Sequence, residues 1–404
     1  MGRFLQTTPN STIHNHKNSI LRNALVLSGL AVSALGAGGA SAGEVAIHGL
    51  LDMGLNYSVT DVAGESTSTL QLASGQNGMS RWSLSGSETL SPSLKAGFVL
   101  ESGVALDSGE LMKNLQGALF GREAQVYLKG RFGTIKLGRL ASFVSGFNQT
   151  GLFGPKVSPF SAGWLNVPGH KSVMTGEFAP YDNMVVYSTP KFGAWQAHLQ
   201  YSFGTEQEKI TDAGLEEGTE EVDRAAAAAV TFTTGNAHAV VIVDTLAYGN
   251  LQNADARLKD ARRVSLGGHY DFGPVKVFAA GQWFEGVQKL TMGEIDTGAN
   301  LLNKVAGRSD LSRDGIDGLG LNVGVTIPVN AFLVKLSTGY MKAENAADSS
   351  IDIDRATVSA GFEYSLSKKT FLYAAAVWQH DAYGREDIQD ADRIGVAAGL
   401  VTRF

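Results

Sequence analysis

From Glu44 to the C-terminus, apolar and polar residues alternate along the chain with a period of two. The segment 355–366 shows the pattern clearly, with Ala356, Val358, Ala360, Phe362, Tyr364 and Leu366 on one face and Arg355, Thr357, Ser359, Gly361, Glu363 and Ser365 on the other. The segments 195–203 and 263–272 repeat it. Successive side chains of a strand point to opposite faces, so the pattern predicts β-strands with one apolar and one polar face.

The connections between the expected strands alternate between short and long. Seven short turns are rich in Gly, Pro, Asn and Ser: 91–93, 130–133, 190–194, 234–236, 272–274, 328–330 and 367–369. Eight long loops lie between them, near 58–79, 105–120, 141–182, 204–223, 249–262, 285–316, 344–354 and 381–391. A soluble sandwich would show the same alternation over shorter strands. Strands of about ten residues with this loop pattern instead predict a closed antiparallel transmembrane barrel of 16 strands, with short periplasmic turns and long external loops.

Aromatic residues and the last residue agree with a membrane barrel. Aromatics gather near the expected strand ends, as in the girdles at membrane interfaces: Tyr57, Trp82, Trp195, Tyr201, Tyr270, Phe272, Trp283, Phe332, Tyr340, Phe362, Tyr364 and Trp378. The final strand places Phe404 on its apolar face. We expect Phe404 to anchor the C-terminus at the membrane.

The N-terminal residues have the features of a secretory signal. Arg3, Lys17 and Arg22 precede the apolar segment 24–35, and the small residues 40–42 provide an Ala-Ser-Ala cleavage pattern. A short buried helix is the alternative. We therefore expect residues 1–42 to be a signal peptide and residues 43–404 to form the barrel domain.

Composition narrows the class further. The mean hydropathy is −0.02, and the expected mature chain has no run of 18 apolar residues, which excludes a helical membrane protein. The chain has 49 Gly and only 9 Pro, which suits crowded strands and turns better than helix bundles.

The longest stretch without a strand signal in the first half of the chain is Ala141–Asp182. It is rich in aromatics and contains Lys156, Lys171 and His170, but no Asp or Glu before Glu177. A structureless loop of roughly 40 residues is usually functional or disordered, and its apolar content is high for disorder. We expect the loop to fold into the lumen; the alternative is a disordered surface insertion.

Several segments carry a resemblance to a known family. The residues 45–57 (VAIHGLLDMGLNY), 80–103, 122–139 (REAQVYLKGRFGTIKLGR), 183–204 and 399–404 (GLVTRF) resemble the general porins of Gram-negative outer membranes, of the β-proteobacterial type. The resemblance implies a trimeric barrel of sixteen strands in the outer membrane, with the third external loop, 141–182, forming a constriction. It also implies contact with outer-membrane lipid and lipopolysaccharide. Two departures are His48, where the family usually has Tyr, and Val186, where a basic residue is common.

The candidate pore residues follow from strand parity and from the resemblance. Parity places Arg81, Lys95, Arg263, Lys335, Arg355, Arg393 and Arg403 inside, with Asp52, Glu101, Asp271 and Glu363 opposing them. The loop adds Lys156 and Lys171. Arg81, Arg122 and Arg139 match family positions, although strict parity aims Arg122 and Arg139 at lipid unless a bulge turns them. Because bases outnumber acids, we predict a weak to moderate preference for anions.

Other kinds of chemistry have little support in the sequence. The acidic stretch 204–223 lacks the spacing of a calcium loop and fits a solvated charge run better. The histidines lack metal-ligand spacing, no nucleophile motif is present, and the bases are not interleaved with aromatics. We expect no metal, cofactor, enzymatic activity or nucleic-acid partner.

Three functional classes remain open. The first is a channel for passive diffusion of small hydrophilic solutes and ions. The second is a substrate-selective channel of the same architecture. The third is a non-conducting barrel, such as an adhesin. Many inward positions carry Gly or Ser, including Gly267, Gly320, Gly324 and Gly339. We interpret these small residues as a sign of an open lumen.

Overall fold

The computed structural model describes residues 44–112, 118–146, 150–161, 164, 167–176, 180–249, 258–288, 314–384 and 389–404. The expected signal peptide lies outside these ranges and remains a prediction. The strands are β1 Glu44–Val62, β2 Glu65–Ser74, β3 Arg81–Ser91, β4 Leu94–Gly103, β5 Glu123–Gly130, β6 Gly133–Ala141, β7 Pro180–Ser188, β8 Trp195–Ser202, β9 Arg224–Thr233, β10 Ala237–Ala247, β11 Ala261–Asp271, β12 Lys276–Val287, β13 Ile316–Val329, β14 Phe332–Asn345, β15 Asp348–Ser365, β16 Thr370–Tyr383 and β17 Ala391–Arg403. The short helices are η2 Gly154–Lys156, η3 His170–Ser172 and α1 Gln207–Asp212.

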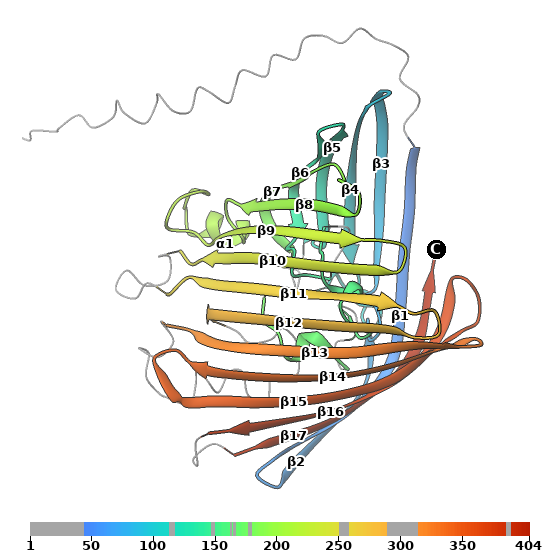
Figure 1. The fold of residues 1–404 in the computed structure, drawn as a ribbon, viewed down its shortest axis with the longest axis vertical. Helices are drawn as coiled ribbons and strands as arrows, with labels where there is room; N and C mark the ends of the chain where they lie inside the picture. The colour runs from blue at the N-terminus through green and yellow to red at the C-terminus, as the bar shows by residue number, and fades with distance from the viewer. Residues whose placement is uncertain are drawn as a thin grey trace, which may run out of the picture. The chain divides into compact units, whose positions relative to one another are not determined.

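The strands form a closed antiparallel ring in chain order (Figure 1). β1 and β3 to β17 make sixteen consecutive positions, and pairing from Leu50↔Arg403 to Val62↔Ala391 closes the ring between β1 and β17. The predicted barrel of 16 strands is confirmed. β2 is an additional strand: it pairs with residues 53–62 of β1, while β3 pairs with residues 44–50.

The period of two in the sequence becomes an outer and an inner face. In β10, Val241 and Val243 are exposed on the outside, whereas Val240 and Ile242 are buried on the inside. The predicted apolar face of 355–366 is likewise outward, with Val358 and Phe362 exposed. Exposed apolar side chains on an outer wall match a lipid environment. Among the described residues, no helix has the length and apolar character needed to cross a membrane.

All seven predicted short turns connect strands, but two predicted long loops are wrong. Residues 58–79 are mostly a hairpin of β1 and β2, which turns at Ala63 and Gly64 with φ of 59° and 82°. Residues 344–354 belong mostly to β14 and β15, and the Asn345 side chain accepts hydrogen bonds from the backbone N–H groups of Ala347 and Asp348. In the first of these hairpins, both faces of residues 65–69 are polar and exposed, so the alternation that marks a strand disappears there.

Candidate functional site: the lumen and its inserted loop

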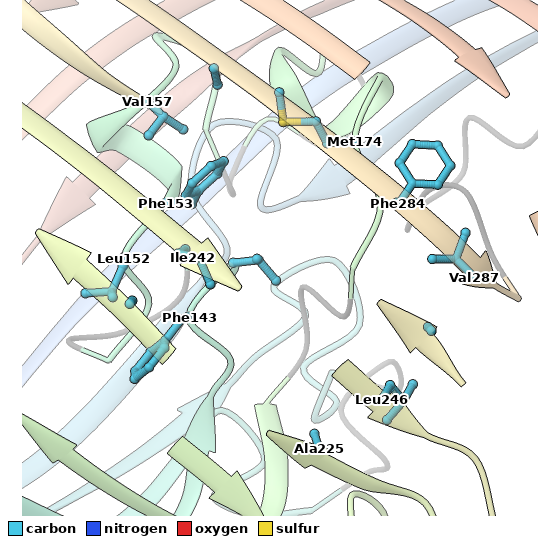
Figure 2. Packing of buried hydrophobic residues seen from close by; sticks show 14 of the residues in the cluster. Phe143, Leu152, Phe153, Val157, Met174, Ala225, Ile242, Leu246, Phe284 and Val287 are labelled. Carbon is cyan, nitrogen blue, oxygen red and sulfur yellow. The ribbon is translucent and has the colours of Figure 1, made fainter. Parts of the chain in front are cut away.

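The loop between β6 and β7 lies inside the barrel, as predicted. Its apolar side chains are almost fully buried: Phe143, Val144, Leu152, Phe153, Val157, Phe160, Trp164, Val167, Val173 and Met174. Most of them form one cluster with inward side chains of the strands. Figure 2 shows Phe153, Val157 and Met174 of the loop in this cluster, together with Ile242 of β10 and Phe284 of β12. The loop is therefore packed against the wall.

Inward glycines of β11, β13 and β14 receive the loop. A Cβ atom on Gly320 would overlap the carbonyl oxygen of Val173. A Cβ on Gly324 would lie 2.7 Å from the Pro159 ring, and one on Gly267 would lie 2.7 Å from Val157. These glycines, with Gly339 beside Val173, form what we call the glycine seam. Our interpretation of these four glycines as a sign of open space is wrong, because the loop occupies the space beside them.

Polar side chains of the wall hold the loop backbone. Gln282 of β12 accepts a hydrogen bond of 2.6 Å from the Thr175 N–H and donates one of 2.9 Å to the Thr175 carbonyl. The Ser359 hydroxyl donates to the Pro168 carbonyl at 2.9 Å, and the Phe143 N–H donates to Gln200 at 2.7 Å. Buried backbone groups without partners are costly, so these contacts fix the path of the loop.

Burial lowers the pKa values of three basic residues in the loop. It lowers the pKa of His170 to about 3, with a further contribution from the positive charge of Lys171. It lowers the pKa of Lys171 to about 7. Burial also lowers the pKa of Lys156, whose side chain keeps partial exposure to the lumen. Of the two lysines predicted for the constriction, Lys156 is thus the accessible one and Lys171 is buried.

Arg139 lies at the base of the loop. Its guanidinium pairs with Asp182, and its Nε donates to the Gly121 carbonyl at 2.7 Å. Arg139 lies in β6 and Asp182 in β7, so the pair joins the two ends of the inserted segment. The pairing of β6 with β7 shifts register between Gly138 and Leu140, which is the irregularity that parity alone could not locate.

Three of the predicted pore bases are neutralised by acids on neighbouring strands. Arg355 and Asp381 are both fully buried and share two hydrogen bonds of 2.7 Å. Arg263 pairs with Asp244. Lys335 pairs with Glu363 at 2.5 Å and lies 5.4 Å from the centre of the Trp164 ring. Arg393 is buried on the inner face of β17. These bases support the wall behind the loop.

Arg81 is a lumen residue of a different kind. Its Nε lies 3.7 Å from Glu101, and its side chain is 32% exposed. Glu101 also accepts a hydrogen bond of 2.6 Å from the Nε of Arg122, which is buried. The Glu101 carboxylate therefore lies between two guanidinium groups, those of Arg81 and Arg122.

Four lysines face the lumen without an acid within ion-pair distance among the described residues: Lys95, Lys129, Lys136 and Lys156. Lys136 donates a hydrogen bond of 2.9 Å to Thr150 in the loop. The sequence reasoning named Lys95 and Lys156 but missed Lys129 and Lys136. Parity could have found them, because Lys129 shares its face with Gln125 and Lys136 lies opposite Tyr127.

Three inward histidines line the wall next to Lys156. His198, His238 and His269 come from β8, β10 and β11. The rings of His238 and His269 stack at 5.7 Å, and His269 lies 2.8 Å from the Lys156 carbonyl oxygen. Among the described residues, no group of three or more His, Asp or Glu could hold a metal ion.

Phe404 takes part in closing the barrel. Its N–H donates to the Gly49 carbonyl at 3.1 Å, and the Gly49 N–H donates back at 3.3 Å. Its ring covers Gly49, where a Cβ atom would overlap it. The ring is 51% exposed.

The fold and the lumen together define a class of protein, the outer-membrane barrel channel. The residues 29–381 match the family model described as Gram-negative porin. The chain is 28% identical to an outer membrane porin protein of Bordetella pertussis, over 93% of this chain and 99% of that one. It is also 28% identical to outer membrane porin protein 32 of Delftia acidovorans, over 85% of this chain and 86% of that one.

A solved structure has the same fold. The anion-selective porin from Comamonas acidovorans matches with a TM-score of 0.62 and 23% identity, over 90% of this chain and 100% of that one. The present chain belongs to the Gram-negative porin family, and it is a channel of the outer membrane.

Proposed function

We propose that this porin is a passive channel for small hydrophilic solutes and ions, with a preference for anions and no catalytic step. The observation that carries the proposal is the set of four lumen lysines, Lys95, Lys129, Lys136 and Lys156, which have no acid within ion-pair distance in the part of the chain that the structure describes. The name of the Comamonas structure, an anion-selective porin, agrees with it.

The charges near the accessible lumen matter more than the formal net charge of −6. Exposed charges are screened beyond about 8–10 Å, so external loop acids act weakly on an ion inside the pore. Most inward acids already have partners in the wall. Asp244, Asp381 and Glu363 form ion pairs with basic side chains. Asp52 accepts hydrogen bonds from Asn77, Gly78 and Tyr373. An entering anion therefore meets mainly ammonium groups.

The test is the reversal potential of single channels under a KCl gradient. We expect a chloride preference in the native protein and a smaller one in the double variant Lys136→Gln/Lys156→Gln. The matched control is Lys368→Gln, which removes one exposed charge in the short turn after β15. A cation preference of the native protein, or equal shifts in the variant and control, would contradict the proposal.

We also propose that the channel assembles as a homotrimer and contacts lipid and lipopolysaccharide through its remaining outer surface. A groove of about 650 Å³ lies on the outer wall near the β1–β17 closure, lined mainly by apolar residues that include Leu55, Leu72, Phe362, Leu372, Ala398 and Leu400. Such a groove supports close packing of two barrels. Ala398→Trp should fill it and shift the trimer band to monomer on a non-denaturing gel. Retention of the trimer would count against this interface.

Export is part of the same proposal. We propose that residues 1–42 are removed as a signal peptide and that residues 43–404 are the mature chain, whose loop 141–182 narrows the pore. The burial of the loop against the wall supports this role. Mass spectrometry of the protein purified from outer membranes tests the cleavage site directly.

A further inference from the structure

A cavity of about 400 Å³ opens on the lumen side of β1 and β3 to β6, near the short turns. Its polar lining includes Lys95, Lys129, Lys136, Gln125, Tyr127 and Ser87. Glu44 is the one acidic residue among the lining side chains. Three ammonium groups and one carboxylate leave a formal surplus of two positive charges.

The strand register brings these residues together in two rows. In one row, Lys95 lies directly opposite Lys129 across β4 and β5, with Thr89 and Thr134 at its ends. In the neighbouring row, Tyr127 lies opposite Gly97 on one side and Lys136 on the other. A Cβ atom on Gly97 would overlap the end of the Tyr127 ring, so the glycine lets the phenol lean over β4. The phenol and the three amines therefore border one space.

The facing lysines are an unfavourable arrangement by themselves. Like charges directly opposite each other on adjacent strands destabilise a sheet. Both side chains are exposed to the lumen, and no described acid lies within ion-pair distance of either. Several hydrogen-bond donors and a positive surplus thus border a cavity that is open to solutes.

We propose that this cavity binds a small oxyanion carrying two or more negative charges, such as inorganic phosphate. Lys95, Lys129 and Lys136 supply charge-assisted donors, and the hydroxyls of Tyr127 and Ser87 supply neutral ones. These side chains face the lumen and not the lipid, so the ligand is a dissolved solute. The volume exceeds that of one such ion and leaves room for water, which keeps exchange fast.

The site rests on the proposed anion preference and narrows it to a substrate class. Separate ammonium groups along a pore attract any anion. Three ammonium groups around one cavity favour a multivalent anion over chloride. Lys136 belongs to both features, because it lines the cavity and donates to Thr150 of the inserted loop. The cavity thus adjoins the inserted loop, which we propose narrows the pore.

The experiment compares phosphate with chloride at equal ionic strength. We expect phosphate to reduce the single-channel chloride current saturably in the native protein. In Lys95→Gln/Lys129→Gln, the half-blocking concentration should rise about tenfold or more, because two charge-assisted contacts are lost. The matched control, Lys368→Gln/Lys369→Gln, removes two exposed lysines from a short turn outside the cavity and should behave like the native protein.

A stability measurement tests the same site independently of conductance. Removal of one facing lysine in Lys129→Gln should raise the melting temperature in phosphate-free buffer of low ionic strength, since it relieves repulsion. Phosphate should raise the melting temperature of the native protein and have little effect on the double variant. An equal response of native and double-variant proteins to phosphate would overturn the site.

The outcomes separate this site from the general selectivity. Chloride preference without saturable phosphate block would leave the anion channel intact and reject the cavity. Saturable phosphate block that disappears in the double variant, without chloride preference in KCl, would support the cavity and reject general anion preference.

Discussion

At the scale of single residues, ion pairs decide which charges an entering solute can meet. Parity correctly placed Arg263, Lys335 and Arg355 on inner faces, but a one-dimensional pattern carries no information on cross-strand partners. The register places Arg355 opposite Asp381 and Arg263 opposite Asp244. These three predicted pore bases are thus paired with acids in the wall. The charge that a solute can reach comes from other residues, such as Lys95 and Lys156.

Arg355 and Asp381 give the first prediction. Arg355→Ala leaves a buried carboxylate without its partner, so it should lower the free energy of unfolding by about 3–5 kcal/mol. The double variant Arg355→Met/Asp381→Leu should lose much less, because both charges are gone. Urea unfolding of the refolded protein in detergent measures both. Equal losses in the two variants would contradict a dominant role for the unpaired charge.

Gly320 gives the second prediction. Gly320→Ala places a methyl group against the Val173 carbonyl, and overpacking of this kind costs about 1–3 kcal/mol. The loop should also shift, which changes the single-channel conductance. Gly235→Ala is the control, because an added Cβ there meets nothing within 4 Å. Identical conductance and stability of the two variants would show that the loop is not held at Gly320.

At the scale of elements, the inserted loop and the β1–β2 hairpin show where prediction from sequence succeeds and fails. The loop was recognised because it interrupts the alternation and is rich in aromatics. Its insertion into the lumen is predictable, but the wall that receives it is not, since that depends on glycines of β11, β13 and β14 that come much later in the chain. β2 was missed because its residues 65–69 are polar on both faces. Strand signals persist only where one face is apolar.

The third prediction concerns the docking of the loop at acidic pH. Burial lowers the pKa of His170 from its ordinary 6.5 to about 3. Between these values, the docked loop binds fewer protons than a released loop. Docking therefore weakens as the pH falls from about 6.5 towards 3, by up to about 1.4 kcal/mol per pH unit. Single-channel recordings should show more frequent fluctuations at pH 4.5 than at pH 7.

A matched pair of variants isolates this effect. His170→Phe keeps an aromatic ring beside Phe153 but cannot titrate, so its recordings should change less with pH. His48→Phe removes a different lumen histidine and should keep the native pH response. An unchanged pH response in His170→Phe would assign the effect to other groups.

At the scale of the whole molecule, closure of the ring depends on the two ends of the barrel domain. β1 and β17 pair over thirteen positions, and Phe404 extends this pairing to Gly49. Sixteen strands were predictable from the loop pattern, and the apolar phase of the last strand was predictable from alternation. The outer groove near this closure was not predictable from the sequence, because side chains from both ends of the chain line it.

The fourth prediction tests this closure. Phe404→Ala removes the ring that covers Gly49 and should slow refolding into detergent, seen as a smaller fraction of the compact band on an unheated gel. Phe192→Ala is the control, since Phe192 is an exposed aromatic in the short turn before β8. Comparable refolding of both variants would mean that the terminal ring is dispensable.

The glycine seam makes the two sides of the pore unequal in their tolerance to sequence change. On the side of β11, β13 and β14, side-chain volume at the seam is limited by the docked backbone, so substitutions there act on folding before they act on permeability. On the side of β4 to β6, Lys95 and Lys129 are exposed to the lumen and Lys136 is partly exposed. Substitutions that change which solutes pass can therefore accumulate on the wall that carries the lysines, while the sequence at the glycine seam stays constant.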